Sequence, residues 1–235
     1  MAESPQKQHG TPVGRRVVLA MVGLGAFGVA AGKWLSEGVS EVVASTVPQL
    51  ASVLPAAGGF RIYTVVGGYP DIPPDYRLTV TGMVDKQLSL SLADLAKLPQ
   101  TSFTKDFQCV TGWRVENVPW SGVLLRDVLH AAGVQDGASA LTFSSFDRAY
   151  SESLTLDQAM GDVLVATSMF GAPIEVQHGA PVRLYVVPMY GYKSIKWMSG
   201  IDVGRKIVPG YWEQLGYDVD AFIGASNGRS DDPTV

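Results

Sequence analysis

The 235-residue sequence predicts an α+β fold, with mixed β-sheets and short helices. Three observations lead to this prediction. Short β-branched and apolar runs recur along the chain, as in sheets with several strands. Two capping boxes, Ser91-Leu-Ala-Asp94 and Thr155-Leu-Asp-Gln158, indicate helices of only a few residues. The runs and the helices do not alternate regularly, which argues against a parallel βαβ architecture.

The expected strands show either alternating or continuous apolar side chains, the two patterns typical of β-structure. Residues 76–82 alternate apolar and polar side chains, as in a strand with one buried face. The other candidates are enriched in apolar and β-branched side chains, and they are residues 102–109, 141–146, 163–167, 182–187 and 195–203.

The expected helices begin at polar side chains that can cap the first turn. The helix after Ser91 is expected to end before Pro99, and Thr155 opens another short helix. Ser121 is expected to cap a third helix, which Gly133 ends. That third helix has one apolar face, formed by Leu124, Leu125, Val128 and Leu129.

Composition excludes several classes of function. The formal net charge is −4, whereas a general nucleic-acid-binding protein is usually basic. One cysteine can form neither an internal disulfide nor a cysteine-rich metal site, and three histidines, one near the N-terminus, exclude a histidine-rich one. The sequence also lacks a phosphate-binding Gly-rich loop, a His-Glu-x-x-His motif and a Gly-x-Ser-x-Gly nucleophile elbow.

Residues 1–36 have the pattern of an export signal or a membrane anchor. A polar, net positive stretch precedes the apolar residues 17–31. The pair Arg15-Arg16 resembles a twin-arginine signal, which exports folded proteins. We therefore expect an extracytoplasmic protein, periplasmic or at the outer face of the membrane, which residues 17–31 would anchor if they are retained. The further expected parts are a linker at residues 37–59, a folded domain at 60–226 and a flexible tail at 227–235.

Cys109 lies where an expected strand meets a turn, close to large aromatic side chains. Three interpretations fit such a residue. It can be a small buried apolar side chain, a nucleophile paired with His178, or a thiolate ligand of a soft metal. The third interpretation needs a cofactor that brings the remaining ligands, because the protein supplies no others.

Three cations, Arg183, Lys193 and Lys196, lie close together in a chain that has few charges. Arg183 stands on an expected strand, and the two lysines follow a Gly/Tyr-rich turn after Pro188. Such a group can bind a buried phosphate through charge-assisted hydrogen bonds. The alternative is a strand whose cations extend toward solvent.

The chain carries an ordered set of motifs: Asp106-Phe-Gln-Cys-Val-Thr-Gly-Trp113, Pro119-Trp-Ser-Gly122, Gly179-Ala-Pro-Val-Arg-Leu-Tyr-Val-Val-Pro188, Tyr190-Gly-Tyr-Lys-Ser-Ile-Lys196 and Gly210-Tyr-Trp-Glu213. The set resembles the molybdopterin-binding domain of the sulfite oxidase family, in the small bacterial form of the periplasmic methionine sulfoxide reductase catalytic subunit. Any one of the motifs is weak, whereas their order is specific. The resemblance implies a sulfite-oxidase-type fold over about residues 60–224 and a molybdenum–molybdopterin cofactor.

By this resemblance, Cys109 is the catalytic residue and the thiolate ligand of molybdenum. Arg183 matches the arginine of the pterin pocket, and together with Lys196 it would offset the phosphate of the cofactor. The other cofactor-binding residues that the resemblance implies are Arg61, Tyr63, Ser145, His178, Ser194 and Ile195.

Two departures from the family pattern bear on the substrate. Sulfite oxidases have an arginine-rich sequence after the cysteine, where this chain has Val110-Thr-Gly-Trp-Arg114. The sulfoxide reductase has a glutamate at the position of Thr111. The implied substrate is a small sulfoxide- or sulfite-like molecule. Trp113, Tyr190 and Tyr192 are expected either in the wall of its channel or in the core.

The resemblance thus implies an exported oxidoreductase that transfers an oxygen atom to or from its substrate. The sequence lacks the dimerisation and cytochrome domains of animal sulfite oxidases. We therefore expect a monomer that exchanges electrons with a separate partner, such as a haem protein of the membrane, and that binds no nucleic acid. Two alternatives stay open, namely a cofactor-free extracytoplasmic binding module of the same fold and a thiol enzyme that uses Cys109 and His178.

Overall fold

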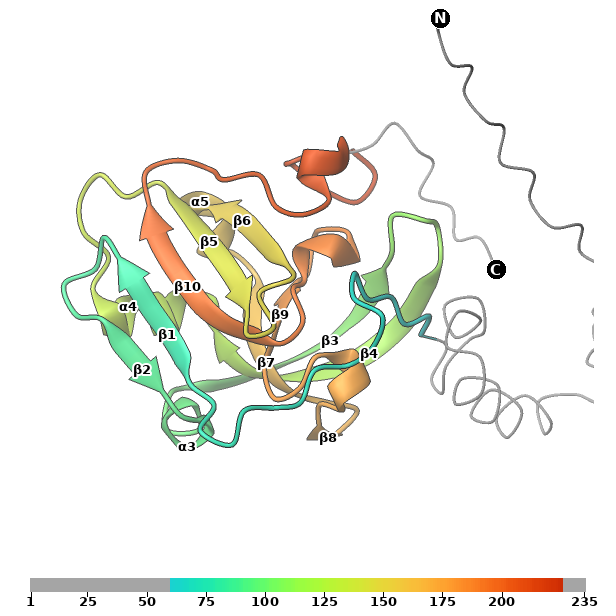
Figure 1. Cartoon of the computed structure of the whole chain (residues 1–235), viewed down its shortest axis with the longest axis horizontal. Helices are drawn as coiled ribbons and strands as arrows, with labels where there is room; N and C mark the ends of the chain where they lie inside the picture. The colour runs from blue at the N-terminus through green and yellow to red at the C-terminus, as the bar shows by residue number, and fades with distance from the viewer. Residues whose placement is uncertain (1–59, 226–235) are drawn as a thin grey trace, which may run out of the picture. The chain divides into compact units, whose positions relative to one another are not determined.

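The computed structural model describes residues 60–225, which fold into two β-sheets with short helices (Figure 1). This arrangement confirms the predicted α+β class. The expected export segment at residues 1–36, the linker at 37–59 and the tail at 227–235 lie outside the described residues. Within residues 60–225, no helix has both the length and the apolar character that crossing a membrane requires.

The first sheet has five strands in the order β2-β1-β10-β5-β6. β1 and β10 are parallel, whereas the other neighbours are antiparallel. Because β1 opens the domain and β10 comes near its end, their pairing brings distant parts of the sequence together (Figure 1). The strands are β1 (Leu78–Gly82), β2 (Leu88–Leu90), β5 (Ala140–Ser145), β6 (Ser151–Thr155) and β10 (Met198–Gly204).

The second sheet is antiparallel and follows the order β3-β4-β7-β8, with β9 also paired to β7. Its first two strands form a long hairpin, whose short connecting loop contains Cys109 (Figure 1). The strands are β3 (Gln100–Gln108), β4 (Arg114–Leu124), β7 (Val163–Met169), β8 (Ala172–Pro173) and β9 (Arg183–Val186).

The helices are short, and both predicted capping boxes are confirmed. The Ser91 and Thr155 hydroxyls accept hydrogen bonds from the backbone at Asp94 and Gln158, whose side chains bond back to the capping residues. These bonds satisfy N–H groups that a first helical turn leaves without partners. The α-helices are α3 (Leu92–Leu95), α4 (Leu125–Ala132) and α5 (Leu156–Ala159), and the 3₁₀ turns are η3 (Val176–His178), η4 (Gly191–Lys193) and η5 (Glu213–Leu215).

The prediction that Ser121 caps a helix was wrong. Ser121 lies inside β4, where its Oγ is 3.0 Å from Ser102 Oγ on the neighbouring strand. α4 begins only at Leu125, and Leu124 precedes it without a side-chain cap. The strand continues because it pairs on both sides, with β3 and with β7. The predicted end of the helix at Gly133 is confirmed, since that residue adopts a left-handed conformation with φ +70°.

The core contains buried side chains from both sheets and from α4. Val80 and Phe143 come from the first sheet, Val165 and Leu184 from the second, and Leu129 from the helix. Burying one large apolar side chain contributes about 1.5–3 kcal/mol, so this cluster is the main source of stability. It holds the β3–β4 loop and the segments between β9 and β10 in fixed positions.

Candidate active site

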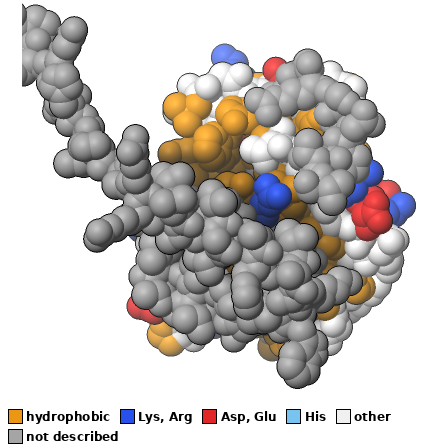
Figure 2. Space-filling view, turned by 90° about the vertical axis from the view of Figure 1, so that its right-hand side faces the viewer, with side chains coloured by type: hydrophobic (Ala, Val, Ile, Leu, Met, Phe, Trp, Pro, Cys, Tyr) orange, Lys and Arg blue, Asp and Glu red, His pale blue; other side chains and the backbone are white. Residues whose placement is uncertain are grey.

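A cavity of about 220 Å³ lies where four parts of the chain meet. They are residues 60–65 before β1, the end of β3 with the β3–β4 loop, the segment from η3 to the start of β10, and single residues of the β5–β6 and C-terminal loops. Most of the lining is apolar. On the face shown in Figure 2, apolar side chains likewise reach the surface over a broad area beside a few basic ones.

Cys109 lines this cavity from the β3–β4 loop. Its backbone N–H donates to the Trp113 carbonyl at 2.9 Å, and Gly112 N–H donates back to the Cys109 carbonyl at 3.0 Å. Gly112 has φ +102°, a conformation that glycine adopts without strain. Thr111 Oγ1 donates a hydrogen bond of 3.2 Å to Cys109 Sγ. The tight turn therefore presents a half-buried sulfur to the cavity.

Aromatic rings surround the sulfur side of the cavity. Phe60, Phe107 and Trp113 contact one another with ring centroids 5.4–6.1 Å apart. Tyr63 stacks on Trp113 at 6.4 Å, although 43% of Tyr63 remains exposed. Such rings exclude water and strengthen electrostatic interactions inside the cavity.

Arg183 lies at the buried side of the cavity. Its Nη1 and Nη2 donate to the carbonyls of His178 and Ser194 at 2.8 and 2.9 Å. The guanidinium carbon stands 5.3 Å from the ring centroids of both Phe107 and Trp120. Burial lowers the pKa of Arg183 to about 10, so the group stays cationic at neutral pH. Within residues 60–225, no carboxylate forms a salt bridge with it.

Lys196 adds a second cation to the lining. Its Nζ donates to the carbonyls of Tyr63 and Gln177 at 2.8 and 2.9 Å, and it forms no salt bridge with any described carboxylate. Burial, together with the charge of Arg183, lowers the pKa of Lys196 to about 7. Two cations that no carboxylate of residues 60–225 neutralises favour an anionic ligand, whose charge would return the pKa of Lys196 toward its ordinary value.

His178 ends η3 and lines the same cavity. Its ring meets Phe60 edge-on at 5.1 Å. Burial, then the charges of Arg183 and Lys196, lower its pKa to about 4, so the imidazole is neutral at pH 7. The next residue, Gly179, has φ +110°, and a Cβ there would lie only 2.9 Å from Lys196 Cβ. Glycine therefore allows η3 to lie against the lysine.

The depressed pKa of His178 predicts a loss of stability in acid. The ordinary value is 6.5, so between about pH 6.5 and 4 the unfolded chain takes up a proton that the folded protein does not. We expect the urea midpoint of the wild type to fall across this window, and to fall less in His178→Gln. The exposed His130 provides the control His130→Gln, which should keep the wild-type slope. Equal slopes in all three proteins would contradict the prediction.

The structure brings most of the residues implied by the resemblance to this one cavity, namely Arg61, Tyr63, Cys109, His178, Arg183, Ser194, Ile195 and Lys196. Ser145 is not among the lining residues. Its hydroxyl instead contacts Asp147 and donates to the Tyr150 carbonyl at 3.0 Å. Of the three aromatic candidates, Trp113 and Tyr192 line the cavity, whereas Tyr190 is buried in the core.

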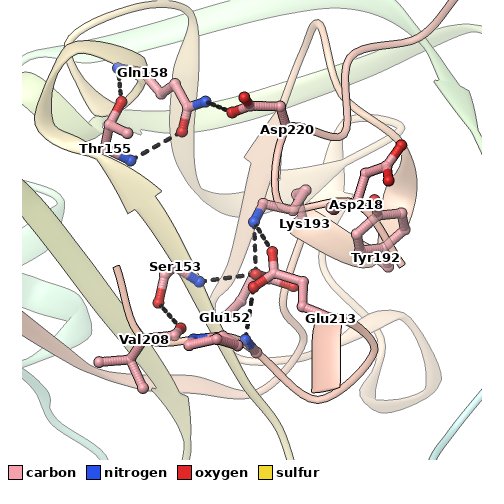
Figure 3. A network of polar contacts seen from close by, with 12 residues as sticks. Glu152, Ser153, Thr155, Gln158, Tyr192, Lys193, Val208, Glu213, Asp218 and Asp220 are labelled. Atoms are coloured by element: carbon pink, nitrogen blue, oxygen red, sulfur yellow. Dashed lines mark hydrogen bonds and ion pairs between the residues drawn. The ribbon is translucent and has the colours of Figure 1, made fainter. Parts of the chain in front are cut away.

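The expectation that Lys193 joins an anion-binding group with Arg183 and Lys196 was wrong. The Lys193 ammonium is fully buried and forms ion pairs with Glu152 and Glu213 (Figure 3). Two residues separate Lys193 from Lys196 along an irregular turn, and the two side chains have different partners. Only Arg183 and Lys196 of the three cations line the cavity.

Sequence reasoning missed several lining residues: Phe60, Tyr150, Gly191, Trp212 and Tyr217. They come from separate segments, so no local spacing relates them. A Cβ at Gly191 would collide with the Phe107 ring, which explains the glycine there. The motif at residues 210–213 was the one signal for the C-terminal part of the wall.

Cys109 and His178 do not form a catalytic pair in this structure. Among the described residues the only hydrogen bond to Cys109 Sγ comes from Thr111, and no triad with a third orienting group is formed. The same part of the chain holds no cluster of three metal-ligating His, Cys, Asp or Glu side chains. A metal at this site would therefore need a cofactor with ligands of its own.

Comparison with known proteins identifies the family. Residues 66–212 match the model of the oxidoreductase molybdopterin-binding domain. The chain belongs to this family. It is therefore an oxidoreductase with a molybdopterin-binding domain, and the predicted family is confirmed.

Relatives with names are found in bacteria and plants. An uncharacterised oxidoreductase of Bacillus subtilis is 35% identical and aligns over 60% of this chain and 72% of its own length. A sulfite oxidase of Arabidopsis thaliana and a protein-methionine-sulfoxide reductase catalytic subunit of Campylobacter jejuni are each 30% identical, over 60% and 59% of this chain. The match spans about half the length of these two relatives, 45% and 52%.

A solved structure supports the fold. The sulfane dehydrogenase SoxCD from Paracoccus pantotrophus is similar with a TM-score of 0.56 and 26% identity. The likeness covers 60% of this chain and 41% of that one. The mixed sheets with short helices are thus those of a sulfite-oxidase-type molybdopterin-binding fold.

The cavity residues fit the group that this family binds. One thiol faces the cavity, two cations there lack carboxylate partners among the described residues, and the wall is aromatic. The indole Nε1 of Trp113 is buried and also has no hydrogen-bond partner in the described part of the chain. An anionic, planar cofactor that brings its own metal ligands would satisfy all of these groups.

Proposed function

We propose that the chain is an exported molybdenum–molybdopterin oxidoreductase that transfers an oxygen atom to or from a small sulfoxide- or sulfite-like substrate. The observation that carries this proposal is the Cys109 sulfur in a cavity with two cations, the buried Arg183 and the half-buried Lys196, neither of which has a carboxylate partner within residues 60–225. When bound, the cofactor would supply a metal that exchanges two electrons as the oxygen atom moves.

The residues of the chain then have separate roles. Cys109 would be the thiolate ligand, oriented by its tight turn and by the Thr111 hydrogen bond. Arg183 and Lys196 would neutralise the phosphate of the cofactor, because both present donors inside a cavity of low polarity. The further cofactor contacts that we propose are Arg61, Tyr63, His178, Ser194 and Ile195. Ser145 is outside the cavity lining, so its contribution to cofactor binding would be indirect.

The lining favours an uncharged sulfoxide over sulfite. Arg114 follows Cys109 in the position of the arginine-rich sequence, but its guanidinium donates to Gln108 Oε1 at 2.6 and 2.9 Å. It does not line the cavity. Thr111 and Trp113 of the Cys109 loop, together with Tyr192, instead give the cavity a neutral stretch of wall. A neutral wall binds an uncharged molecule without the cost of desolvating an oxyanion.

We further propose that the protein works outside the cytoplasm as a monomer. The Arg15-Arg16 pair fits export of a folded protein. Export in the folded state would allow the molybdopterin cofactor to be inserted in the cytoplasm before the protein crosses the membrane. Residues 17–31 would hold it at the membrane if they are retained. Electrons would pass to or from a separate redox partner, of which a haem protein of the membrane is the candidate.

The proposal is tested in two steps, first by measuring the cofactor content of the protein and then by comparing its rates of sulfoxide reduction and sulfite oxidation. The full chain is expressed with its own N-terminal segment in a molybdate-fed host, and molybdenum and pterin are quantified. We expect one of each per chain, with sulfoxide reduction by a reduced dye faster than sulfite oxidation by an oxidised dye. A folded protein without molybdenum and pterin would contradict the proposal and favour the binding module, and faster sulfite oxidation would reverse the substrate preference.

A further inference from the structure

A cluster of three ionisable side chains lies fully buried behind the cavity. Lys193 Nζ is 2.7 Å from Glu152 Oε1 and also contacts Glu213 Oε1 (Figure 3). All three side chains are at most 1% exposed. Glu152 stands on β6, Lys193 on η4 and Glu213 on η5. This buried cluster therefore joins three segments that are distant in the sequence.

Each segment of the buried cluster carries an aromatic residue of the cavity wall. Tyr192 directly precedes Lys193, Trp212 directly precedes Glu213, and Tyr150 lies two residues before Glu152. All three aromatic residues line the cavity. The ion pairs thus fix the backbone at the points from which these rings enter the wall.

The rings also contact one another on the cavity side. Tyr150 Oη donates to the Tyr192 carbonyl at 2.6 Å. Tyr217 meets both Tyr192 and Trp212 edge-on, with centroids 5.5 and 5.3 Å apart. These four residues form one aromatic wall, Tyr150, Tyr192, Trp212 and Tyr217, and the cluster supports it from behind.

The cluster needs one extra proton to be neutral, since it pairs one ammonium with two carboxyl groups. Glu152 and Glu213 both contact the same ammonium, so their carboxyls lie close together, and a proton on one of them removes the repulsion between two buried carboxylates. Glu152 Oε2 is buried and has no hydrogen-bond partner among the described residues. The other contacts are backbone N–H groups, from Ser153 to Glu152 and from Gly210 to Glu213.

Burial raises the pKa of Glu152 to about 8, with Glu213 adding to this rise and the charge of Lys193 opposing it. The groups that face Glu152 are Lys193 on η4 and Glu213 on η5, and the phenol of Tyr150 faces both carboxyls. Burial and these two carboxyls raise the pKa of Tyr150 well above the ordinary value, so it stays neutral in the same range. Loss of the proton would leave an uncompensated charge in the buried cluster.

We propose that Glu152, Lys193 and Glu213 are positioning residues that hold the aromatic wall in place, and that the wall depends on a proton shared by the two carboxyls. The role in retaining the cofactor rests on the proposed function. The role in ordering the wall belongs to the chain alone and can be measured without cofactor.

The first test follows near-ultraviolet circular dichroism of the full chain between pH 6 and 9, because that signal reports the packing of tyrosine and tryptophan rings. We expect the wild type to lose part of it with a midpoint near pH 8, while the far-ultraviolet signal stays constant. Glu152→Gln keeps the shape of the protonated carboxyl and should remove this transition. Asp157→Asn removes an exposed carboxylate on the adjacent α5 and should keep it.

An unchanged transition in Glu152→Gln, or simultaneous changes of both signals in the wild type, would overturn the proposal. The second readout is release of molybdenum during dialysis, which should be faster above the midpoint than below it in the wild type and independent of pH in Glu152→Gln. Release without any pH dependence would overturn the link to the cofactor. A protein that contains no molybdenum would refute the proposed function, while the dichroism would still decide whether the cluster orders the wall.

The charge balance gives a further test. Lys193→Met leaves a buried carboxylate without its cation, so the thermal midpoint should drop. Adding Glu213→Gln to that variant removes the carboxylate and should restore the midpoint, while the aromatic signal stays reduced because the ties between η4, η5 and β6 are gone. A double variant that is no more stable than Lys193→Met would overturn the neutral cluster.

Discussion

Replacing Cys109 by alanine is expected to abolish the thiolate-to-metal absorption of the molybdenum-loaded protein and its oxygen-transfer activity. The change removes the one cavity side chain that can serve as a thiolate ligand among the described residues. The fold should persist, because Cys109 is half-buried in a turn held by backbone hydrogen bonds. Visible absorption, metal content and turnover of the purified variant measure these outcomes.

Thr111→Val is the matched control for this experiment. It removes the hydroxyl that donates to Cys109 Sγ at 3.2 Å but leaves the sulfur in place. We expect normal metal content with a small displacement of the absorption band, since only a hydrogen bond to the ligand is lost. Unchanged absorption in Cys109→Ala would show that the thiol is not the ligand.

Arg183→Met is expected to separate cofactor binding from stability. The carbonyls of His178 and Ser194 lose donors at 2.8 and 2.9 Å, at about 1–3 kcal/mol each, while the third bond, to the Leu184 carbonyl at 3.4 Å, is long and weak. The substitution also removes a buried cation whose depressed pKa corresponds to a desolvation cost of about 3 kcal/mol. These effects oppose each other, so the free energy of unfolding without cofactor should change by no more than about 2–3 kcal/mol.

Cofactor affinity should respond far more strongly. The guanidinium has five N–H groups, of which three bond to carbonyls of the described residues, so two can donate to a phosphate. Two charge-assisted bonds contribute about 3–6 kcal/mol, and their loss should weaken retention of the cofactor by about 100-fold or more. Chemical denaturation of cofactor-free protein and dialysis of loaded protein measure the two quantities.

Arg205→Met is the control, because Arg205 is exposed and is not among the residues that line the cavity. It should change neither quantity. Normal retention of molybdenum in Arg183→Met would mean that the buried guanidinium serves the fold and not the cofactor.

Much of the fold could be predicted from local signals. Ser91 and Thr155 form capping boxes with residues only three positions away, so the sequence contains both partners of each bond. The prediction for Ser121 failed because a serine hydroxyl that can cap a helix can equally lie within a β-strand. Pairing with β3 and β7 decided between these options, and no local pattern reports that pairing.

The site was predictable where a single segment carries it and unpredictable where several segments meet. Cys109 and Arg183 could be singled out from the residues around them, and both line the cavity. Lys193 and Lys196 look alike in sequence, yet one ion-pairs with Glu152 and Glu213 and the other contacts Tyr63. Their partners are distant in sequence, so only the folded chain distinguishes the two lysines.

The sequence by itself determined the α+β class, the short helices, the family and the residues that its motifs carry, because those properties depend on nearest neighbours and on ordered motifs. The tertiary structure decided which side chains share the cavity. The parallel pairing of β1 with β10 joins segments near opposite ends of the domain, and the buried cluster joins Lys193 to Glu152 and Glu213, which are 41 and 20 positions away. Contacts of this kind are specified by the packing of the whole core, and for that reason the aromatic wall emerged only from the folded chain.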